Sequence, residues 1–256
     1  MADKGLLTGE LQQRYYRYKR LLEENNFSMP TKKIMFGVRM TVMVSLVIFS
    51  ISNAVTGMAV QKTETECIWD GFFVATQPLN KYFEENEGIK HGMMILSSAL
   101  IDSILFIFTI RYILWGKSWR PLIWFVSFYL TRTLIQSVFI MKFPDDNLWD
   151  YPGIPSITVT YLRTTDFFYS GHVGVMVFCA LENRHEGNRL LMYLSTFTAF
   201  FEFFVLLVLR AHYAVDMFAG IVFAHYFWII SGWVSPYLDR WGGYKDSQAD
   251  YNKLQL

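Results

Sequence analysis

Apolar positions in this sequence fall in long runs separated by short polar segments. A helix that crosses about 30 Å of hydrocarbon needs roughly 20 mostly apolar residues, so run length is the first test of each segment. We interpret six runs as spans: residues 34–60, 92–115, 119–141, 167–181, 190–209 and 213–234. The fourth run is the shortest. The pattern predicts an all-α polytopic membrane protein with six transmembrane helices.

The predicted spans occupy most of the chain, and no internal repeat, low-complexity linker or second domain is visible. We therefore expect one membrane domain over residues 34–238, with its catalytic core within 119–235. A basic segment, residues 1–33, precedes this domain, and a polar tail, residues 239–256, follows it.

A further apolar stretch, residues 68–79, is too short to cross a bilayer. It also contains Asp70, Gln77 and Pro78. We expect it to form a re-entrant or interfacial piece within the first loop.

Basic residues are distributed unevenly between the two sides of the predicted bundle, and short cytoplasmic loops carry the excess of Lys and Arg in membrane proteins. One side holds Lys4, Arg14, Arg17, Lys19, Arg20, Lys32, Lys33, Lys117, Arg120, Arg184, Arg189, Arg240, Lys245 and Lys253. The loops on the other side are acidic. Both termini are therefore expected in the cytoplasm.

Composition supports a membrane environment, because 53% of the 256 residues are hydrophobic and 18% are aromatic. The two cysteines, Cys67 and Cys179, fall in an outer loop and inside a span, so no cysteine chemistry is expected. We expect lipid substrates as partners, with no nucleic acid and no cofactor.

Four ionisable residues lie near the middle of predicted spans, where each costs about 2.5 to 3.5 kcal/mol on insertion scales and so needs a partner or a function. They are Asp102, Arg132, Glu202 and His225, at broadly similar depths, where they can pair. For Asp102 and His225 we favour a structural network. Arg132 suits a phosphate oxygen, and for Glu202 both readings stay open.

Two motifs at predicted outer ends of spans carry the candidate chemistry. The first is Tyr-Ser-Gly-His, ending at His172, and the second is Arg-Ala-His-Tyr-Ala-Val-Asp, containing His212 and ending at Asp216. A carboxylate four residues after His212 selects the tautomer that leaves the other ring nitrogen free to attack phosphorus. His172 then protonates the leaving alcohol and deprotonates the incoming one.

The phosphate needs donors, and both motifs lie at helix starts, which attract anions. Gly171 allows close backbone approach, Ser170 adds a hydroxyl and Arg210 adds a charge. We also count Tyr213 among the substrate-binding residues. A metal site built from the two histidines and the aspartate is an alternative that we rank below metal-free chemistry.

At these residues the chain resembles the lipid phosphatase and phosphotransferase superfamily, within it the branch of sphingomyelin synthases and plant-type phosphatidylcholine:diacylglycerol cholinephosphotransferases. The similarity rests on Ser-Gly-His-Val, ending at Val173, and on Arg-x-His-Tyr-x-x-Asp, starting at Arg210. It implies six spans, His172 as the acid/base, and His212 with Asp216 as the nucleophilic pair. It also implies a lumenal active site in the endoplasmic reticulum or Golgi.

Departures from the phosphatase pattern favour transfer over hydrolysis. The phosphatases carry Lys, six residues and then Arg-Pro, whereas the nearest candidates here are Lys117, Arg120 and Pro121, at the wrong spacing and on the cytoplasmic side. Leu206 stands where those enzymes have an arginine, and Tyr169 stands where they have a proline.

Aromatic faces commonly hold a quaternary ammonium. The outer loop contains Trp149, Tyr151, Tyr161, Phe167, Phe168 and Tyr169, which form either a choline cage or an interfacial aromatic belt. Asp166 either meets the ammonium, orients His172 or caps the fourth helix.

The resulting hypothesis is a metal-independent transferase. It moves a phosphocholine-type headgroup from a phospholipid to diacylglycerol or ceramide through a phosphohistidine. The alternatives are a lipid phosphate phosphatase, with water as acceptor, and a non-catalytic lipid carrier or scramblase.

Overall fold

All regular structure in the described part of the chain is helical, as predicted. The computed structural model describes residues 36–45, 48, 69–139, 141–159, 161 and 167–241. The helices are Phe36–Ser45, α3 (Gly71–Glu85), α4 (Glu87–Trp115), α5 (Arg120–Val138), α6 (Gly171–His185), α7 (Arg189–Val208) and α8 (Ala214–Trp241). The predictions for the basic N-terminal segment, Cys67, Asp166 and most of the polar tail lie outside the described residues.

Three of the described helices, α4, α7 and α8, are long and apolar enough to cross a membrane. They correspond to the second, fifth and sixth predicted spans. α5 coincides with the third prediction and α6 with the fourth, but α6 has only 15 residues, or about 22 Å at the usual helical rise. Most of the first predicted span lies outside the described residues, so six spans with cytoplasmic termini stay a prediction.

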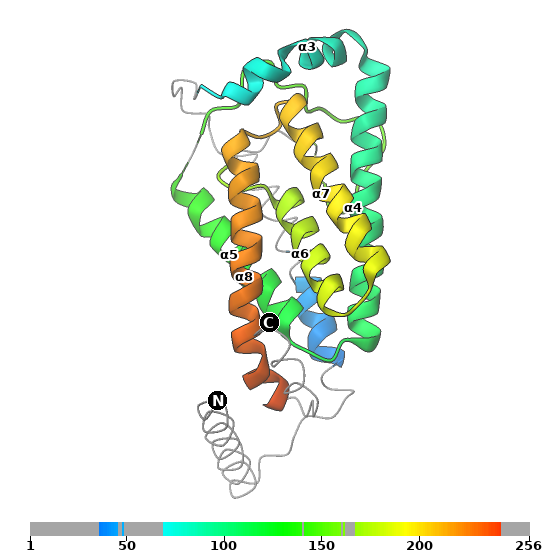
Figure 1. The fold of residues 1–256 in the computed structure, drawn as a ribbon, viewed down its shortest axis with the longest axis vertical. Coiled ribbons are helices and arrows are strands. Elements are labelled where there is room, and N and C mark those ends of the chain that lie inside the picture. Colours follow the sequence, from blue (N-terminus) through cyan, green and yellow to red (C-terminus); the bar gives the residue numbers. More distant parts are fainter. Residues whose placement is uncertain are drawn as a thin grey trace, which may run out of the picture.

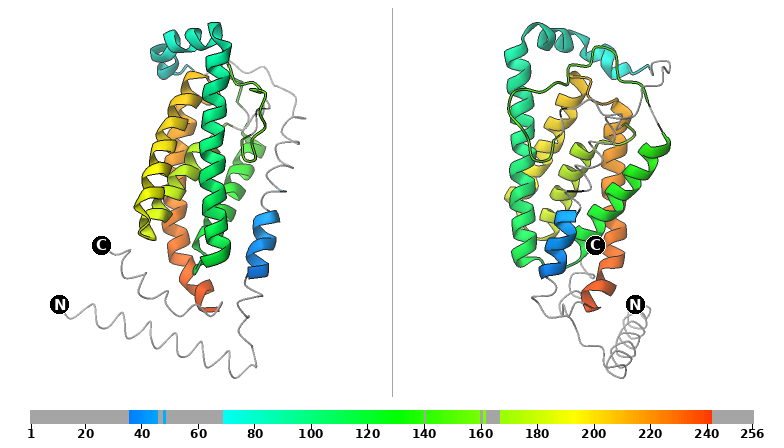
Figure 2. Two further views of the ribbon diagram at one scale, coloured as in Figure 1. Left: turned by 90° about the vertical axis from the view of Figure 1, so that its right-hand side faces the viewer. Right: turned by 180° about the vertical axis from the view of Figure 1, so that it is seen from behind.

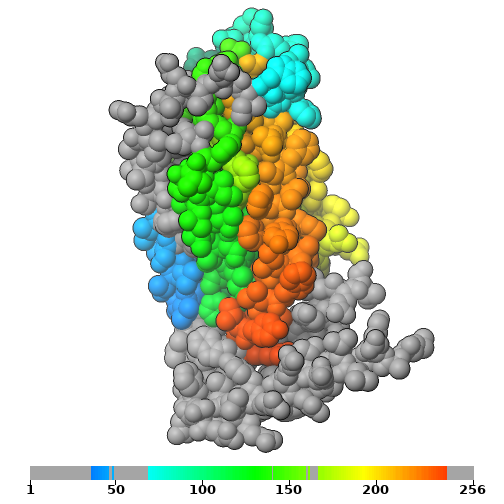
Figure 3. Space-filling view, turned by 90° about the vertical axis from the view of Figure 1, so that its left-hand side faces the viewer, coloured from blue at the N-terminus to red at the C-terminus, as the bar shows by residue number. Residues whose placement is uncertain are grey.

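α6 is the central helix of the bundle. It packs against α4, α7 and α8 (Figure 1). α5 packs on α8 (Figure 3). α3 lies across one end of the bundle, where it contacts α4 and α7 (Figure 2). The stretch that we expected to be a re-entrant or interfacial piece is thus largely an end-capping helix.

The fourth predicted span begins too early, because the structure starts α6 at Gly171. The Ser170 hydroxyl accepts from the Val173 amide and so caps the helix. Phe167 and Tyr169 are buried loop residues that precede the cap. Their apolar side chains lengthened the run without extending the helix.

Residues 156–158 of the loop between α5 and α6 lie against α4 at Asp102, near the middle of that helix. The Asp102 carboxylate accepts from the Ser156 hydroxyl at 2.9 Å and from the amides of Ile157 at 2.9 Å and Thr158 at 3.0 Å. These contacts support the structural reading of Asp102, with a loop rather than another ionisable residue as its partner.

A buried ion pair fixes the opposite end of the bundle. Arg120 Nε lies 2.9 Å from Glu182 Oε2, and the Trp228 indole donates to the same oxygen at 3.0 Å. Both charged side chains are nearly inaccessible to solvent. Because Arg120 is held in this pair, it is unavailable as a phosphate clamp near the N-terminus of α6.

Candidate active site

His172 and His212 lie next to each other at the N-terminal end of α6. His172 is in the first turn of α6, and His212 is in the turn that joins α7 to α8. Their ring centroids are 6.4 Å apart and their ring planes are nearly perpendicular, at 84°. His212 is buried, whereas His172 is partly exposed. This separation allows both rings to contact one phosphoryl group.

Asp216 connects the two motifs. One of its carboxylate oxygens, Oδ2, lies 3.2 Å from His212 Nδ1, and Oδ1 accepts from the Phe168 amide at 3.1 Å. Its backbone carbonyl accepts from the Ser170 amide at 2.9 Å. The side chain is completely buried. A single residue at the start of α8 therefore sets the position of His212 and of the segment that leads to His172.

The Asp216 contact determines which nitrogen of His212 is free. A carboxylate only accepts hydrogen bonds, so we assign the proton of the neutral ring to Nδ1, and Nε2 keeps its lone pair. Among the described residues, none forms a hydrogen bond with Nε2. The geometry thus suits His212 to nucleophilic attack through Nε2.

Glycines allow α8 to approach the start of α6 closely. A Cβ atom on Gly220 would lie 2.8 Å from the Ser170 carbonyl oxygen, which is backbone and cannot move aside. A Cβ on Gly174 would overlap the ring of Phe128. Gly220 follows Asp216 by one helical turn, so it brings the face of α8 that carries Asp216 against the first motif.

We expect Gly220→Ala to lower the activity of the histidine site by roughly 10- to 100-fold, because shifts of about 1 Å in reacting groups cost this much. The added methyl group would push Ser170, and with it His172, away from Asp216. The measurement is kcat of the reconstituted protein. Gly92→Ala is the matched control, since a Cβ on Gly92 meets nothing within 4 Å. Equal activity of the two variants would contradict the prediction.

Arg132 lies beside the first turn of α6. Its Nε donates to the Tyr169 carbonyl at 3.1 Å, and a Cβ on Gly171 would lie 3.7 Å from the same nitrogen. The guanidinium therefore approaches the helix start that carries His172. An anion at this position would meet both a full positive charge and the positive end of a helix.

The start of α8 is a weaker anion site than the sequence suggested. Its first donors are already occupied, because the Tyr213 amide donates to Asp216 at 3.2 Å and the Ala214 amide donates to Asp70 at 2.7 Å. Two carboxylates also repel a phosphate. Of the two helix starts, α6 is the better phosphate site.

Arg210 and Tyr213 are engaged away from the histidine pair. Arg210 Nη1 lies 2.7 Å from Asp146 Oδ2, and Nη2 bonds Gln77 of α3. The Tyr213 ring is buried, and its hydroxyl donates to the Lys142 carbonyl at 3.0 Å. These contacts favour structural roles for two residues that we expected to bind substrate.

The ionisable residues predicted at similar depths do not form one network. Glu202 is buried between α7 and α4, where it accepts from the Ser97 hydroxyl at 2.5 Å. His225 is exposed and stacks on Trp228. The complete burial of Glu202 favours a structural role, because a lipid could not reach it without opening the helix contact.

Three of the six loop aromatics gather beside His172. Trp149 lies 6.3 Å from the His172 ring, Tyr161 lies 5.6 Å from Trp149, and Tyr151 lies 5.9 Å from Tyr161, all between ring centroids. Phe167 packs against His212 at 5.9 Å. We call Trp149, Tyr151 and Tyr161 the aromatic cluster.

The other two aromatics, Phe168 and Tyr169, pack toward α8 and α5. Both contact Phe223, and Tyr169 also contacts Phe128. Burial raises the pKa of the cluster residue Tyr161 above its ordinary value, so its hydroxyl stays neutral.

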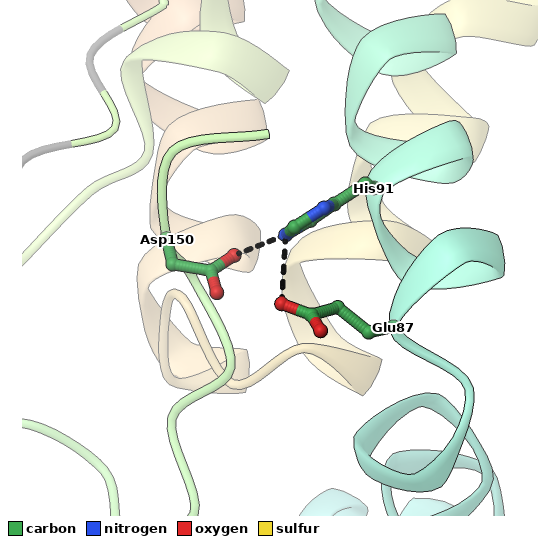
Figure 4. A group of neighbouring side chains, drawn as sticks. All are labelled: Glu87, His91 and Asp150. Atoms are coloured by element: carbon green, nitrogen blue, oxygen red, sulfur yellow. Dashed lines mark hydrogen bonds and ion pairs between the residues drawn. The ribbon is translucent and has the colours of Figure 1, made fainter. Parts of the chain in front are cut away.

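A second group of polar side chains has the composition of a metal site. Glu87 and His91 of α4 and Asp150 of the loop point toward one another, with His91 Nε2 3.3 Å from Asp150 and 3.9 Å from Glu87 (Figure 4). Lys90 already pairs with Asp150 at 2.7 Å. The group is largely exposed and ties the loop to α4.

At the histidine pair, by contrast, the Asp216 oxygens are engaged by ring and amide donors, which favours an orienting role over metal ligation.

A known family matches most of the described part of the chain. The family model AtPDCT1/2 matches residues 69–233, which run from the start of α3 into the last part of α8 and make up more than half of the chain. The searches of curated proteins and of solved structures returned no match. The chain therefore belongs to the phosphatidylcholine:diacylglycerol cholinephosphotransferase family.

Proposed function

We propose that this protein transfers phosphocholine from phosphatidylcholine to diacylglycerol through a covalent intermediate on His212. The observation that carries the proposal is the contact of Asp216 with His212 Nδ1 at 3.2 Å, together with the position of His172 on α6, whose ring faces that of His212. Family membership supports transfer of phosphocholine between lipids. We also propose that the chain belongs to the wider lipid phosphatase and phosphotransferase superfamily, because it carries the two histidine motifs.

The first half-reaction forms the covalent intermediate. The His212 Nε2 lone pair attacks phosphorus, and the bond from phosphorus to the glycerol oxygen of phosphatidylcholine breaks. Protonated His172 gives its proton to that oxygen, so diacylglycerol leaves as a neutral alcohol. Asp216 stabilises the positive charge that develops on His212.

The second half-reaction reverses these steps with a new alcohol. Neutral His172 takes the hydroxyl proton of the incoming diacylglycerol, whose oxygen attacks phosphorus, and the bond from phosphorus to Nε2 breaks. Both histidines return to their starting states. No metal or cofactor enters this scheme.

We assign the phosphate to the start of α6. Arg132 supplies charge there, Gly171 lets the phosphate approach the backbone, and the Ser170 cap fixes the helix start. In the transition state, negative charge on the phosphate oxygens would interact with donors that are already in place.

We assign the choline group to the aromatic cluster, which adjoins His172. Trp149 and Tyr161 are buried and Tyr151 is exposed, so the cluster has both packed rings and access from outside. A quaternary ammonium makes no hydrogen bonds, and aromatic faces compensate for its lost hydration.

Trp149→Leu is expected to lower kcat/KM for phosphatidylcholine by roughly 5- to 30-fold, which corresponds to a cation–π interaction of about 1 to 2 kcal/mol. The rate with phosphatidylethanolamine, whose ammonium has N–H donors, should fall less. Trp115→Leu at the exposed end of α4 is the control. An equal loss for both donors would assign Trp149 a packing role instead.

The site is proposed to face the lumen of the endoplasmic reticulum or Golgi. Acidic residues Asp145, Asp146 and Asp150 lie in the loop at the histidine end. The opposite end of the bundle carries Lys117, between α4 and α5, and Arg184, near the end of α6. This distribution supports an orientation with the histidines away from the cytoplasm.

The deciding experiment reconstitutes the full chain with phosphatidylcholine labelled in the choline group and with an unlabelled diacylglycerol of different acyl length. Label in the new phosphatidylcholine species is the expected result. Label in sphingomyelin, when ceramide is supplied, would identify ceramide as the acceptor. Release of free phosphocholine would indicate hydrolysis. Label that stays in the original donor with every acceptor would refute the proposal.

A further inference from the structure

Asp70 is an acidic residue outside both histidine motifs, and its carboxylate joins two helix starts. Oδ1 accepts from the Phe72 amide at 2.9 Å and caps α3. Oδ2 accepts from the Ala214 amide at 2.7 Å, at the first residue of α8. One short side chain thereby connects α3 to the turn that carries His212.

Other contacts of α3 reach the same segment, residues 208–214. Asn80 Nδ2 donates to the Val208 carbonyl at 2.8 Å, where α7 ends, and the Phe73 ring lies 5.6 Å from the Tyr213 ring. Asn80 and Phe73 are buried in these contacts. The helix thus holds both ends of the turn from α7 to α8, and Asp70 holds the end nearest His212.

We infer that Asp70 is a positioning residue, which keeps the turn in the conformation that presents His212 to His172. The inference rests on the proposed transferase function. The two amides that follow His212 in the chain are both held by carboxylates, Tyr213 by Asp216 and Ala214 by Asp70. Asp216 lies in the first turn of α8, only four residues after His212, so Asp70 is the carboxylate that anchors this segment to a separate element, the start of α3.

Asp70→Asn is designed to remove the contact with the Ala214 amide while keeping the cap on the Phe72 amide. Asparagine caps helices about as well as aspartate, so α3 keeps its start. Its remaining acceptor oxygen cannot serve Phe72 and Ala214 together, and the amide group donates rather than accepts. Asp70→Ala removes both contacts and serves as the second variant.

The test combines hydrogen exchange with kinetics on the full chain. In Asp70→Asn, we expect the Ala214 amide to exchange roughly 10- to 100-fold faster, because a hydrogen bond to a charged group has been lost. We also expect kcat per folded molecule to fall about tenfold, with KM for phosphatidylcholine within about twofold, because the turn is displaced but the headgroup contacts remain. Asp70→Ala should show the same two changes. Glu84→Gln, which removes an exposed carboxylate from α3, should match wild type.

Two results would overturn the inference. One is wild-type exchange at Ala214 in both Asp70 variants, which would mean that the carboxylate does not hold the turn. The other is faster exchange with unchanged kcat, which would mean that the turn is held but the reaction does not depend on it. A merely structural role would reduce the amount of folded protein and leave kcat per folded molecule unchanged. Failure of the proposed function is a separate result: the wild-type protein would transfer no phosphocholine. The hydrogen-exchange measurement does not depend on that activity, so an Ala214 exchange rate equal to wild type in both variants would still show that Asp70 does not hold the turn.

Discussion

Replacement of His212 by alanine is expected to abolish phosphocholine transfer, with a loss in kcat of about 10³-fold or more, because removal of the nucleophile from a catalytic group has effects of this size. The ring that would form the covalent bond is absent, and Asp216 is left with no imidazole to orient. The measurement is transfer of choline-labelled headgroup to diacylglycerol by the reconstituted variant. In a rapid-quench experiment, the wild-type protein should also carry covalently bound label, and the variant should carry none.

His225→Ala is the matched control, because this histidine lies on α8, the helix that follows His212, where it is exposed and stacks on Trp228. It should retain wild-type transfer. Transfer at the wild-type rate by His212→Ala would contradict the covalent mechanism. In that case the headgroup would pass directly between lipids, with the histidine pair reduced to a binding role.

The second-largest effect is expected for Asp216→Asn, with kcat lower by roughly 10³- to 10⁴-fold, as when the carboxylate behind a catalytic imidazole is neutralised. An asparagine amide can donate to Nδ1 and so place the ring proton on Nε2, which removes the attacking lone pair. The substitution also weakens the acceptors for the Phe168 and Tyr213 amides. The measurement is kcat in the same headgroup-transfer assay.

Asp145→Asn provides the control for loss of a carboxylate near the site. Its side chain is exposed, at 68% of its accessible area, and pairs only loosely with Lys142 at 3.6 Å. Such a surface pair contributes little, so we expect activity close to wild type. If Asp216→Asn fell no further than this control, Asp216 would not be orienting the nucleophile.

Much of the helical fold was predictable because a membrane helix must be both long and apolar. α4, α7 and α8 coincide with apolar runs, and the structure supports each as a candidate span. The same criterion was wrong at the start of α6, because Phe167 and Tyr169 are equally apolar but pack as loop residues. An apolar side chain indicates that a residue is buried, but it does not indicate where a helix begins. That boundary depends on the cap at Ser170.

The pairing of His212 with Asp216 was predicted from their spacing, and the structure contains this contact at 3.2 Å. The contact does not arise from a regular helical face, because α8 begins only at Ala214. The approach of His172 to the same ring was expected from the topology alone. The catalytic roles of these residues stay predictions for the experiments above to test.

The residues that surround the site were less predictable than the histidines. Arg210 lies two residues before His212 in the chain, and so we expected it to bind phosphate. Its side chain instead meets Asp146 and Gln77, because the loop and α3 pack against the end of α7. A neighbour in sequence can point in any direction that its backbone allows, and only packing selects one.

By itself, the sequence determined that this is an all-helical membrane-type chain with two histidine motifs at helix starts, because apolar run length and residue spacing are local properties. Only the tertiary structure decided that Asp216 joins both motifs, that carboxylates occupy the Tyr213 and Ala214 amides at the start of α8, and that α3 is anchored to the turn that carries His212. In the sequence, Asp70 and Gln77 are recognisable only as polar residues of a stretch too short to cross a bilayer. Their partners lie far along the chain, and such long-range contacts depend on how the helices pack.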